Sequence, residues 1–255
     1  MARVLAIANQ KGGVGKTTTV INVAAFLADQ GQRVLAVDLD PQGNTTTGLG
    51  VDKASGEATL YEVLMDGLPI GQAVVATEVV GLHVVPATIE LAGATVELAA
   101  REGRERRLRE ALAPVIARYD YILIDCPPSL GLLTVNALVA ADAVWIPVQC
   151  EFFALEGLGQ LLQTIELVRR RLNPQLQVEG AILTMYDART NLAAQVAAEV
   201  RRFLGERVFP VPVPRTVRLS EAPSHGLPIS RYDPRSRAAE VYRLIAQEVV
   251  RRGTA

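Results

Sequence analysis

A glycine-rich segment near the N-terminus contains the residue types that bind a polyphosphate. Residues 11–18 read Lys-Gly-Gly-Val-Gly-Lys-Thr-Thr. The glycines let the backbone turn tightly around an anion, so that successive N–H groups and the positive end of a following helix point at it. The second lysine adds a cation for the β- and γ-phosphates, and the threonine after it offers a hydroxyl to Mg²⁺. The segment predicts a Mg-ATP site made by Lys11, Gly12, Gly13, Val14, Gly15, Lys16, Thr17 and Thr18.

The residues around this segment predict the elements that hold it. Residues 4–8 form an apolar run typical of a buried strand, and residues 17–29 carry apolar side chains at helical spacing. A second apolar run at 34–37 completes a β-α-β unit. A glycine-rich turn without a ligand is the alternative interpretation, but the strand-to-helix context favours a phosphate-binding loop (P-loop).

The rest of the chain repeats the alternation of strands and helices. Further strands are predicted at 82–85, 121–124, 143–148, 181–185 and 208–211. Helical patterns lie at 105–118, 155–172, 192–204 and 234–252. Segment 43–57, rich in Gly, Thr and Ser, is expected to be a loop too short to separate two domains. We therefore expect a single P-loop NTPase domain over residues 1–255, with a doubly wound, mainly parallel β-sheet and helices on both faces.

Composition limits the class of protein and conceals an asymmetry of charge. No run approaches about 18 apolar residues and the N-terminus lacks a signal-peptide pattern, so we expect a cytoplasmic protein. Cys126 and Cys150 stand alone and there are two histidines, which predicts neither disulfides nor a zinc site.

The net charge of the chain is −1, yet residues 161–255 contain 15 Lys and Arg against 9 Asp and Glu. This basic C-terminal third can contact a polyanion, although solvated helix faces are the alternative.

Lys11 is one cation more than an ordinary P-loop needs. Residues 9–16, Asn-Gln-Lys-Gly-Gly-Val-Gly-Lys, form a deviant Walker A motif and resemble the ParA/MinD superfamily. The resemblance implies that Lys11 reaches across a two-fold interface to the nucleotide of the other subunit. The site would then be complete only in an ATP-dependent homodimer, where the second cation offsets phosphate charge. A solvated Lys11 is the alternative.

Two aspartates, Asp40 and Asp125, fall at predicted carboxyl ends of strands, where ligands lie in open α/β sheets. Asp125 ends the run Tyr-Ile-Leu-Ile-Asp as a Walker B carboxylate does, and is expected to hold Mg²⁺ through a water; a helix N-cap is the alternative. Asp40 resembles the family carboxylate that orients or deprotonates the attacking water, and we assign it to the metal site together with Thr17. Asp38 is expected to support the loop or contact the metal shell.

Motifs along the whole chain extend the resemblance. They are Val-Asp-Leu-Asp-Pro-Gln-Gly-Asn at 37–44, Ile-Asp-Cys-Pro-Pro-Ser at 124–129 and Arg-Leu-Ser-Glu-Ala-Pro-Ser at 218–224. Together they are similar to the ParA/Soj family, which partitions chromosomes and plasmids. The resemblance implies a weak ATPase whose ATP-bound sandwich dimer binds double-stranded DNA without sequence preference and associates with the nucleoid. It also implies a ParB/Spo0J-type centromere-binding partner that stimulates hydrolysis and release.

The start of the P-loop near residue 9 leaves no room for the N-terminal helix-turn-helix domain of longer family members, so specific operator reading is not expected. Two arginines match family positions that contact DNA, namely Arg189 in Met-Tyr-Asp-Ala-Arg-Thr and Arg218. The alternative for each is a surface ion pair, with Asp187 and Glu221 respectively.

Two further residues match positions that line the adenine in relatives. They are Pro214 and Thr216, within Val-Pro-Val-Pro-Arg-Thr. Relatives usually carry Asn at the second position, and a threonine hydroxyl cannot imitate both edges of an amide. The backbone is the alternative source of adenine recognition.

Three other functions share a P-loop of this kind. A MinD-like ATPase acts at a membrane surface through a basic amphipathic C-terminal helix, but the last helical pattern here has an apolar stripe suited to packing on the core. An iron-protein type of reductase needs a pair of cluster ligands, which Cys126 and Cys150 do not form. A kinase or ligase that activates a small substrate is disfavoured only by the resemblance along the whole chain.

Overall fold

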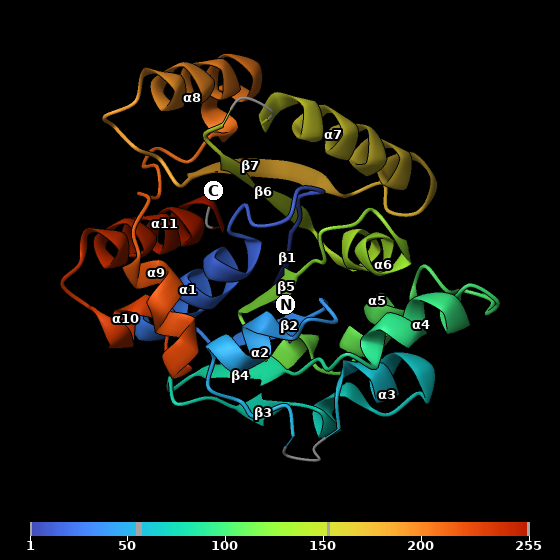
Figure 1. Ribbon diagram of the computed structural model, residues 1–255. Helices are drawn as coiled ribbons and strands as arrows, with labels where there is room; N and C mark the ends of the chain where they lie inside the picture. The colour runs from blue at the N-terminus through green and yellow to red at the C-terminus, as the bar shows by residue number, and fades with distance from the viewer. Residues whose placement is uncertain (1, 55–57, 152–153, 254–255) are drawn as a thin grey trace.

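The computed structural model describes residues 2–54, 58–151 and 154–253. Its seven strands form one sheet in the order β3-β4-β2-β5-β1-β6-β7, which runs from the bottom to the top of Figure 1. The strands are β1 Arg3–Ile7, β2 Val34–Asp38, β3 Val75–Ala76, β4 Leu82–Val85, β5 Tyr121–Asp125, β6 Ala143–Gln149 and β7 Gln177–Thr184. Neighbours are parallel except β3 and β4. This arrangement confirms the predicted doubly wound, mainly parallel sheet.

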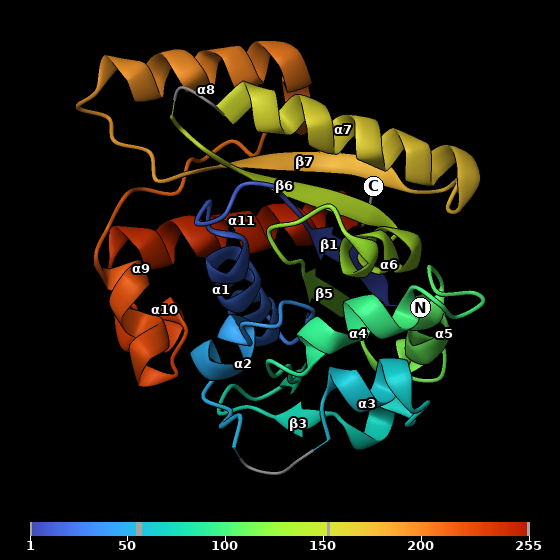
Figure 2. The ribbon, with the colours of Figure 1, turned by 45° about the vertical axis from the view of Figure 1, so that its right-hand side comes forward.

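Helices cover both faces of the sheet. The α-helices are α1 Lys16–Asp29, α2 Asn44–Gly48, α3 Leu60–Met65, α4 Leu91–Leu98, α5 Arg107–Leu112, α6 Leu132–Ala140, α7 Ala154–Arg171, α8 Asn191–Leu204, α9 Arg218–Glu221, α10 Ile229–Tyr232 and α11 Arg237–Gly253. Four short 3-10 helices are η1 Ile70–Gln72, η2 Ile116–Arg118, η3 Gly205–Arg207 and η4 Ala222–His225. Figures 1 and 2 show α1 and α11 side by side on one face. Helices α3 to α8 pack in the hydrophobic core on the other face.

Strand β1 shows why the central strands read as continuous apolar runs. Val4 and Ala6 belong to one hydrophobic core, whereas Leu5 and Ile7 belong to the other. Successive side chains of a strand point to opposite faces, so a strand covered by helices on both sides has no polar face.

The predicted strand at 208–211 is wrong. The segment runs along the edge of the sheet but makes only isolated bridges there, between Val208 and Ala181 and between Pro214 and Tyr186. Pro210 and Pro212 have no N–H to continue the ladder. The helix predicted at 105–118 is likewise interrupted, since Pro114 separates α5 from η2.

Several short elements lie in segments where no helix or strand was predicted. Helix α2 lies inside the segment 43–57, of which residues 55–57 are outside the described part of the chain. Helix α6 is nearly all apolar and is covered by neighbouring elements, so it lacks the polar stripe that marks an amphipathic helix. Two-residue β3 is too short for an alternating pattern to be visible.

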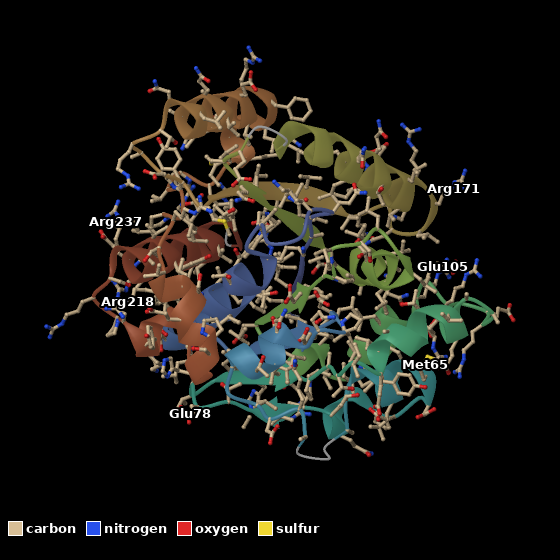
Figure 3. The ribbon with its side chains drawn as sticks, in the orientation of Figure 1. Met65, Glu78, Glu105, Arg171, Arg218 and Arg237 are labelled. Carbon is tan, nitrogen blue, oxygen red and sulfur yellow. The ribbon has the colours of Figure 1, made fainter. Side chains whose placement is uncertain are left out.

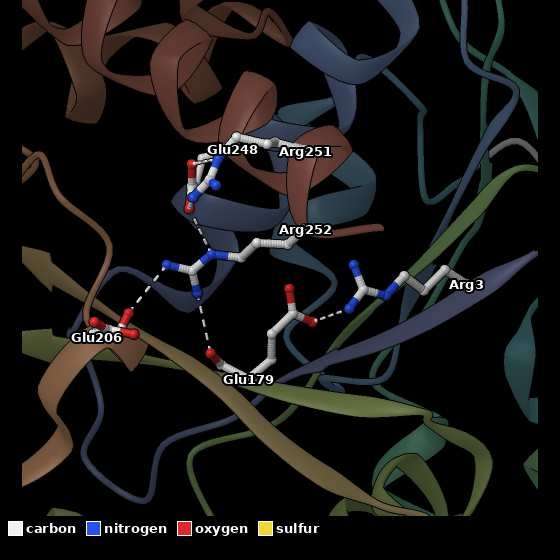
Figure 4. Close-up of polar contacts among 6 residues, drawn as sticks. All are labelled: Arg3, Glu179, Glu206, Glu248, Arg251 and Arg252. Carbon is white, nitrogen blue, oxygen red and sulfur yellow. Dashed lines mark hydrogen bonds and ion pairs between the residues drawn. The ribbon is translucent and has the colours of Figure 1, made fainter. Parts of the chain in front are cut away.

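The end of α11 is fixed to the sheet by a polar network (Figure 4). The Arg252 guanidinium donates to the carbonyl oxygens of Glu179 and Glu206 at 3.1 and 3.4 Å and to the Glu248 carboxylate at 2.7 Å. Arg3 pairs with the Glu179 carboxylate at 2.9 Å. Within the described residues, every helix is too short or too polar to cross a membrane.

Candidate nucleotide-binding site

The glycine-rich segment forms the loop between β1 and α1. Gly15 is the N-cap of α1 with φ 89°, and Gly13 has φ 72°, so both adopt a left-handed conformation that favours glycine. No side chain caps α1 and its first turn carries no acidic residue. The first N–H groups of α1 therefore point at the loop and give it a positive field.

Lys16 places its ammonium inside the loop. The side chain is largely buried, with 6 % of the residue exposed, and Nζ donates to the Lys11 carbonyl at 3.3 Å. Burial lowers the pKa of Lys16, and the nearby negative charges of Asp125 and Asp40 oppose this shift. An ammonium held against the glycine-rich loop has the chemistry to neutralise a polyphosphate.

Asp125 joins the P-loop to a second segment. One of its oxygens, Oδ2, accepts hydrogen bonds from the hydroxyls of Thr17 at 2.8 Å and Thr45 at 2.7 Å. The other oxygen, Oδ1, is buried without a hydrogen-bond partner. An unpaired carboxylate oxygen beside a threonine hydroxyl is a donor set that suits Mg²⁺, so these residues fit the ion. Helix α6 begins at Leu132, which excludes the alternative role of Asp125 as a helix N-cap.

Asp38 lies beside Asp125 in the register of β2 and β5 and holds the loop that follows β2. Its Oδ2 accepts from the backbone N–H and hydroxyl of Thr46 at 2.8 and 2.7 Å, and its Oδ1 accepts from the Asp40 N–H at 3.3 Å. Burial, together with the charge of Asp125, raises the pKa of Asp38 to about 8. Burial also raises the pKa of Asp125, to about 6.

Asp40 occupies the turn between β2 and α2. The residue is 8 % exposed, and one carboxylate oxygen accepts from the Gln42 N–H at 3.0 Å. Its carbonyl accepts from the Gly43 N–H at 2.8 Å. Asp40 lies at the same edge of the sheet as the P-loop, so that its charge raises the pKa values of both Lys16 and Asp125.

The Lys11 side chain pairs with the segment that follows β6. Its ammonium pairs with the Glu151 carboxylate at 3.3 Å, and its backbone N–H donates to Asn9 at 3.0 Å. The Glu151 carboxylate also accepts from the Gln149 side chain at 2.6 Å. Lys11 is thus neither buried nor simply solvated in the single chain. Glu151 carries no sequence motif that would have identified it.

A cavity of about 180 Å³ lies beside the P-loop and continues its surface. Pro214 and Thr216 line it together with Gly15 and Thr18, so the two residues assigned to adenine lie next to the phosphate-binding loop. Thr184, which was not anticipated, also lines the cavity and donates its hydroxyl to the Val14 carbonyl at 2.8 Å.

Arg189 and Arg218 lie on the surface outside this cavity. Arg189 has an 89 % exposed side chain and pairs with Asp187 at 2.7 Å, while Arg218 pairs with Glu221 at 3.1 Å. The ion pairs foreseen as alternatives are therefore formed, and they leave both guanidinium groups at the surface. Arg189 and Arg237 line an open pocket of about 680 Å³ that shares Pro214 and Thr216 with the adenine cavity. Figure 3 shows Arg218 and Arg237 on the same side of the molecule.

A family model and the sequences of known proteins indicate which family this chain belongs to. The family model AAA_31, an AAA domain, matches residues 2–178. Sporulation initiation inhibitor protein Soj of Bacillus subtilis is 58% identical over 253 residues, which cover 99% of this chain and 100% of that protein. The chain belongs to the ParA/Soj family. Chromosome partitioning protein ParA of Myxococcus xanthus, another ParA/Soj member, is 55% identical over 100% of this chain and 90% of that protein.

Solved structures place the ParA/Soj fold among P-loop ATPases. Cobyrinic acid a,c-diamide synthase from Mycobacterium smegmatis, with bound ADP and magnesium, has a TM-score of 0.88 and 43% identity, over 100% of this chain and 96% of that chain. Cell division ATPase MinD of Pyrococcus furiosus has a TM-score of 0.80 and 26% identity, over 98% of this chain and 99% of that chain. ParA/Soj proteins therefore share their architecture with proteins of different names, so function must be argued from the site.

Proposed function

We propose that residues 1–255 form a single ATPase domain that segregates DNA, hydrolysing ATP to ADP and phosphate. The observation that carries the proposal is the arrangement around Asp125. Its unpaired buried oxygen lies beside Thr17, and its negative charge raises the pKa of Lys16. The names of the ParA/Soj relatives support DNA segregation as the use of this site.

Each residue of the site has a role in binding. The N–H groups of Gly12, Gly13 and Gly15 and the ammonium of Lys16 bind the β- and γ-phosphates. Thr17 and Asp125 would hold Mg²⁺, and the ion would offset negative charge on the phosphates. Pro214, Thr216 and the backbone around them hold the adenine.

Hydrolysis requires a base and cations in fixed positions. Asp40 orients the attacking water and accepts its proton as the oxygen–phosphorus bond forms. The electron pair of the breaking bond passes to the β-phosphate oxygen of ADP. Lys16 stabilises the charge that develops on the transferred group, and we assign the same task to Lys11 of the other subunit. Intrinsic turnover is weak until a ParB/Spo0J-type partner stimulates it.

The pair between Lys11 and Glu151 supports a composite site. Lys11 is held away from its own loop, yet it is exposed enough to reach a facing subunit. ATP-dependent formation of a sandwich homodimer then adds the missing cation to each nucleotide.

Binding of double-stranded DNA without sequence preference needs several cations near phosphates. Arg189 and Arg218 supply them in this proposal, because each guanidinium is exposed and can exchange a carboxylate partner for a phosphate. The dimer would then act in the cytoplasm on nucleoid DNA. Such binding weakens steeply as salt rises.

The experiment that tests the function is DNA binding by wild type in ATP, in ADP and without nucleotide, over a range of salt concentrations. Lys16→Ala should abolish the effect of ATP, and Arg189→Ala should weaken binding and lessen its salt dependence. Arg170→Ala is a matched control, because Arg170, on α7, is a 73 % exposed arginine that likewise pairs with a carboxylate, that of Glu166. Equal binding in all nucleotide states would refute the proposal.

A MinD-like role at a membrane surface receives no support from α11. The apolar stripe of the helix is buried in the core beside α1, and it includes Ala238, Val241, Tyr242, Ile245 and Val249. Arg252 also attaches the end of the helix to the sheet. An amphipathic membrane helix needs that apolar face to be available.

A further inference from the structure

Three consecutive threonines of α2 use their hydroxyls in three different ways. Thr45 donates to Asp125 at 2.7 Å and Thr46 donates to Asp38 at 2.7 Å. Thr47 donates only to carbonyls of its own helix turn, to Gly43 at 3.2 Å and Asn44 at 3.5 Å. Thr45 and Thr46 are fully buried, whereas Thr47 is exposed. A threonine hydroxyl in a helix readily satisfies itself on a preceding carbonyl, so the bonds of Thr45 and Thr46 to carboxylates are specific features.

The bond made by Thr45 connects the two halves of the site. The same oxygen of Asp125 accepts from Thr17, which belongs to the P-loop, and from Thr45, which follows the Asp40 turn. The triphosphate site and the water-activating carboxylate lie on separate segments. Asp125 Oδ2 is a single atom to which both segments are hydrogen-bonded.

The turn between Asp40 and Thr45 leaves little freedom for Asp40 to move independently. Gly43 caps α2 with φ 60°, and a Cβ there would lie 2.5 Å from the Ala87 carbonyl oxygen. The turn is therefore restricted to glycine at this point and lies against the backbone of residue 87. Its start is fixed by the bond from the Asp40 N–H to Asp38. Its end is fixed by Thr45 and Thr46.

We propose that Thr45 is a positioning residue, whose hydroxyl aligns the Asp40 turn with the carboxylate that holds Mg²⁺. This inference rests on the proposed ATPase function. In this arrangement, Asp125 accepts from Thr17 in the P-loop and from Thr45 at the end of the Asp40 turn, and so holds the two segments in a fixed relation. Thr45 itself touches neither ATP nor the water.

The test compares Thr45→Val, Thr45→Ser and Thr47→Val. Valine keeps the volume of threonine and removes the hydroxyl, whereas serine keeps the hydroxyl and removes the methyl group. We expect kcat to fall about tenfold or more in Thr45→Val, with a small change in KM, because a hydrogen bond to a charged group is lost in the aligned state. Thr45→Ser should retain most of the activity, and Thr47→Val should resemble wild type.

A binding measurement gives a readout independent of turnover. Affinity for a fluorescent ADP analogue is measured with excess EDTA and with Mg²⁺. With EDTA, Thr45→Val should bind like wild type, since the P-loop is unchanged. The increase in affinity that Mg²⁺ produces should be smaller in Thr45→Val and normal in Thr47→Val.

The possible results separate this inference from the proposed function. Wild-type kcat in Thr45→Val, or a loss in Thr45→Ser as large as in Thr45→Val, would overturn the positioning role, since packing rather than the hydroxyl would then matter. Failure of wild type itself to bind or hydrolyse ATP would overturn the ATPase proposal and this inference with it.

Discussion

The ammonium of Lys11 lies 3.3 Å from the carboxylate of Glu151 in the same chain. Both side chains are partly exposed, at 40% and 45%, so the pair is a surface salt bridge of limited strength. If Lys11 acts on the nucleotide of a second subunit, this pair must open first. In that case Glu151 would compete with the nucleotide of the second subunit for the lysine.

Glu151→Gln should strengthen the ATP-dependent dimer. An exposed pair contributes at most about 1 kcal/mol, which limits the gain to about fivefold for each protomer. Sedimentation of the variant in ATP should show dimer at lower protein concentrations than wild type. Glu166→Gln, which removes the partner of Arg169 and Arg170 on α7, is the control and should not change the dimer. Lys11→Ala should form less of the ATP-dependent dimer. If dimer formation is unchanged in both Lys11→Ala and Glu151→Gln, Lys11 has no role in trans.

Thr46→Val should destabilise the protein. The buried Thr46 hydroxyl donates to Asp38 and accepts from the Ala87 N–H at 3.0 Å, so the substitution leaves two buried groups with fewer partners. The expected loss is about 1–3 kcal/mol in the free energy of unfolding. Urea unfolding measures it, and Thr47→Val should stay within about 0.5 kcal/mol of wild type. A stable Thr46→Val would show that the backbone N–H groups of Thr46 and Asp40 are sufficient partners for Asp38.

Glu248→Gln should alter the acid side of the stability profile. Hydrogen bonds from Arg251 and then Arg252 lower the pKa of Glu248 to about 2, whereas an unfolded glutamate titrates near about 4.3. The charged form therefore contributes stability above about pH 4 that is lost as the pH falls towards 2. Urea unfolding of wild type and variant should give a difference at pH 6 that shrinks towards pH 3. A difference that does not change with pH would show that Glu248 acts through packing.

Thr216→Asn should increase the selectivity of the site for adenine over guanine nucleotides. An amide can donate and accept at the edge of adenine, whereas the Thr216 hydroxyl on the wall of the 180 Å³ cavity makes fewer bonds. One added hydrogen bond of about 1 kcal/mol would raise the preference for ATP over GTP about fivefold. Competition binding measures the ratio, with inorganic triphosphate as the control ligand. An unchanged ratio would indicate that the backbone recognises adenine.

Much of the site could be predicted because its chemistry is local in the chain. The conformation of the P-loop depends on Gly13 and Gly15 and on the strand and helix beside them, all within a short stretch of sequence. Asp40 and Asp125 were readable as strand-end carboxylates for the same reason. The strand predicted at 208–211 failed because the alternating apolar residues are separated by prolines, which cannot continue the ladder.

Contacts between distant segments depended on the tertiary structure. Thr45 and Asp125 are 80 residues apart, and Lys11 and Glu151 are 140 apart. Thr45 and Asp125 meet because β5 lies between β2 and β1, which places Asp38 and Asp125 side by side. Lys11 and Glu151 meet because β1 and β6, the strands that they follow, are neighbours in the sheet. A run of three threonines does not reveal by itself which hydroxyl will face a buried carboxylate. Residue types and their spacing determined what the P-loop can bind, whereas strand order and register decided which side chains meet it, because only packing brings distant segments within hydrogen-bond distance.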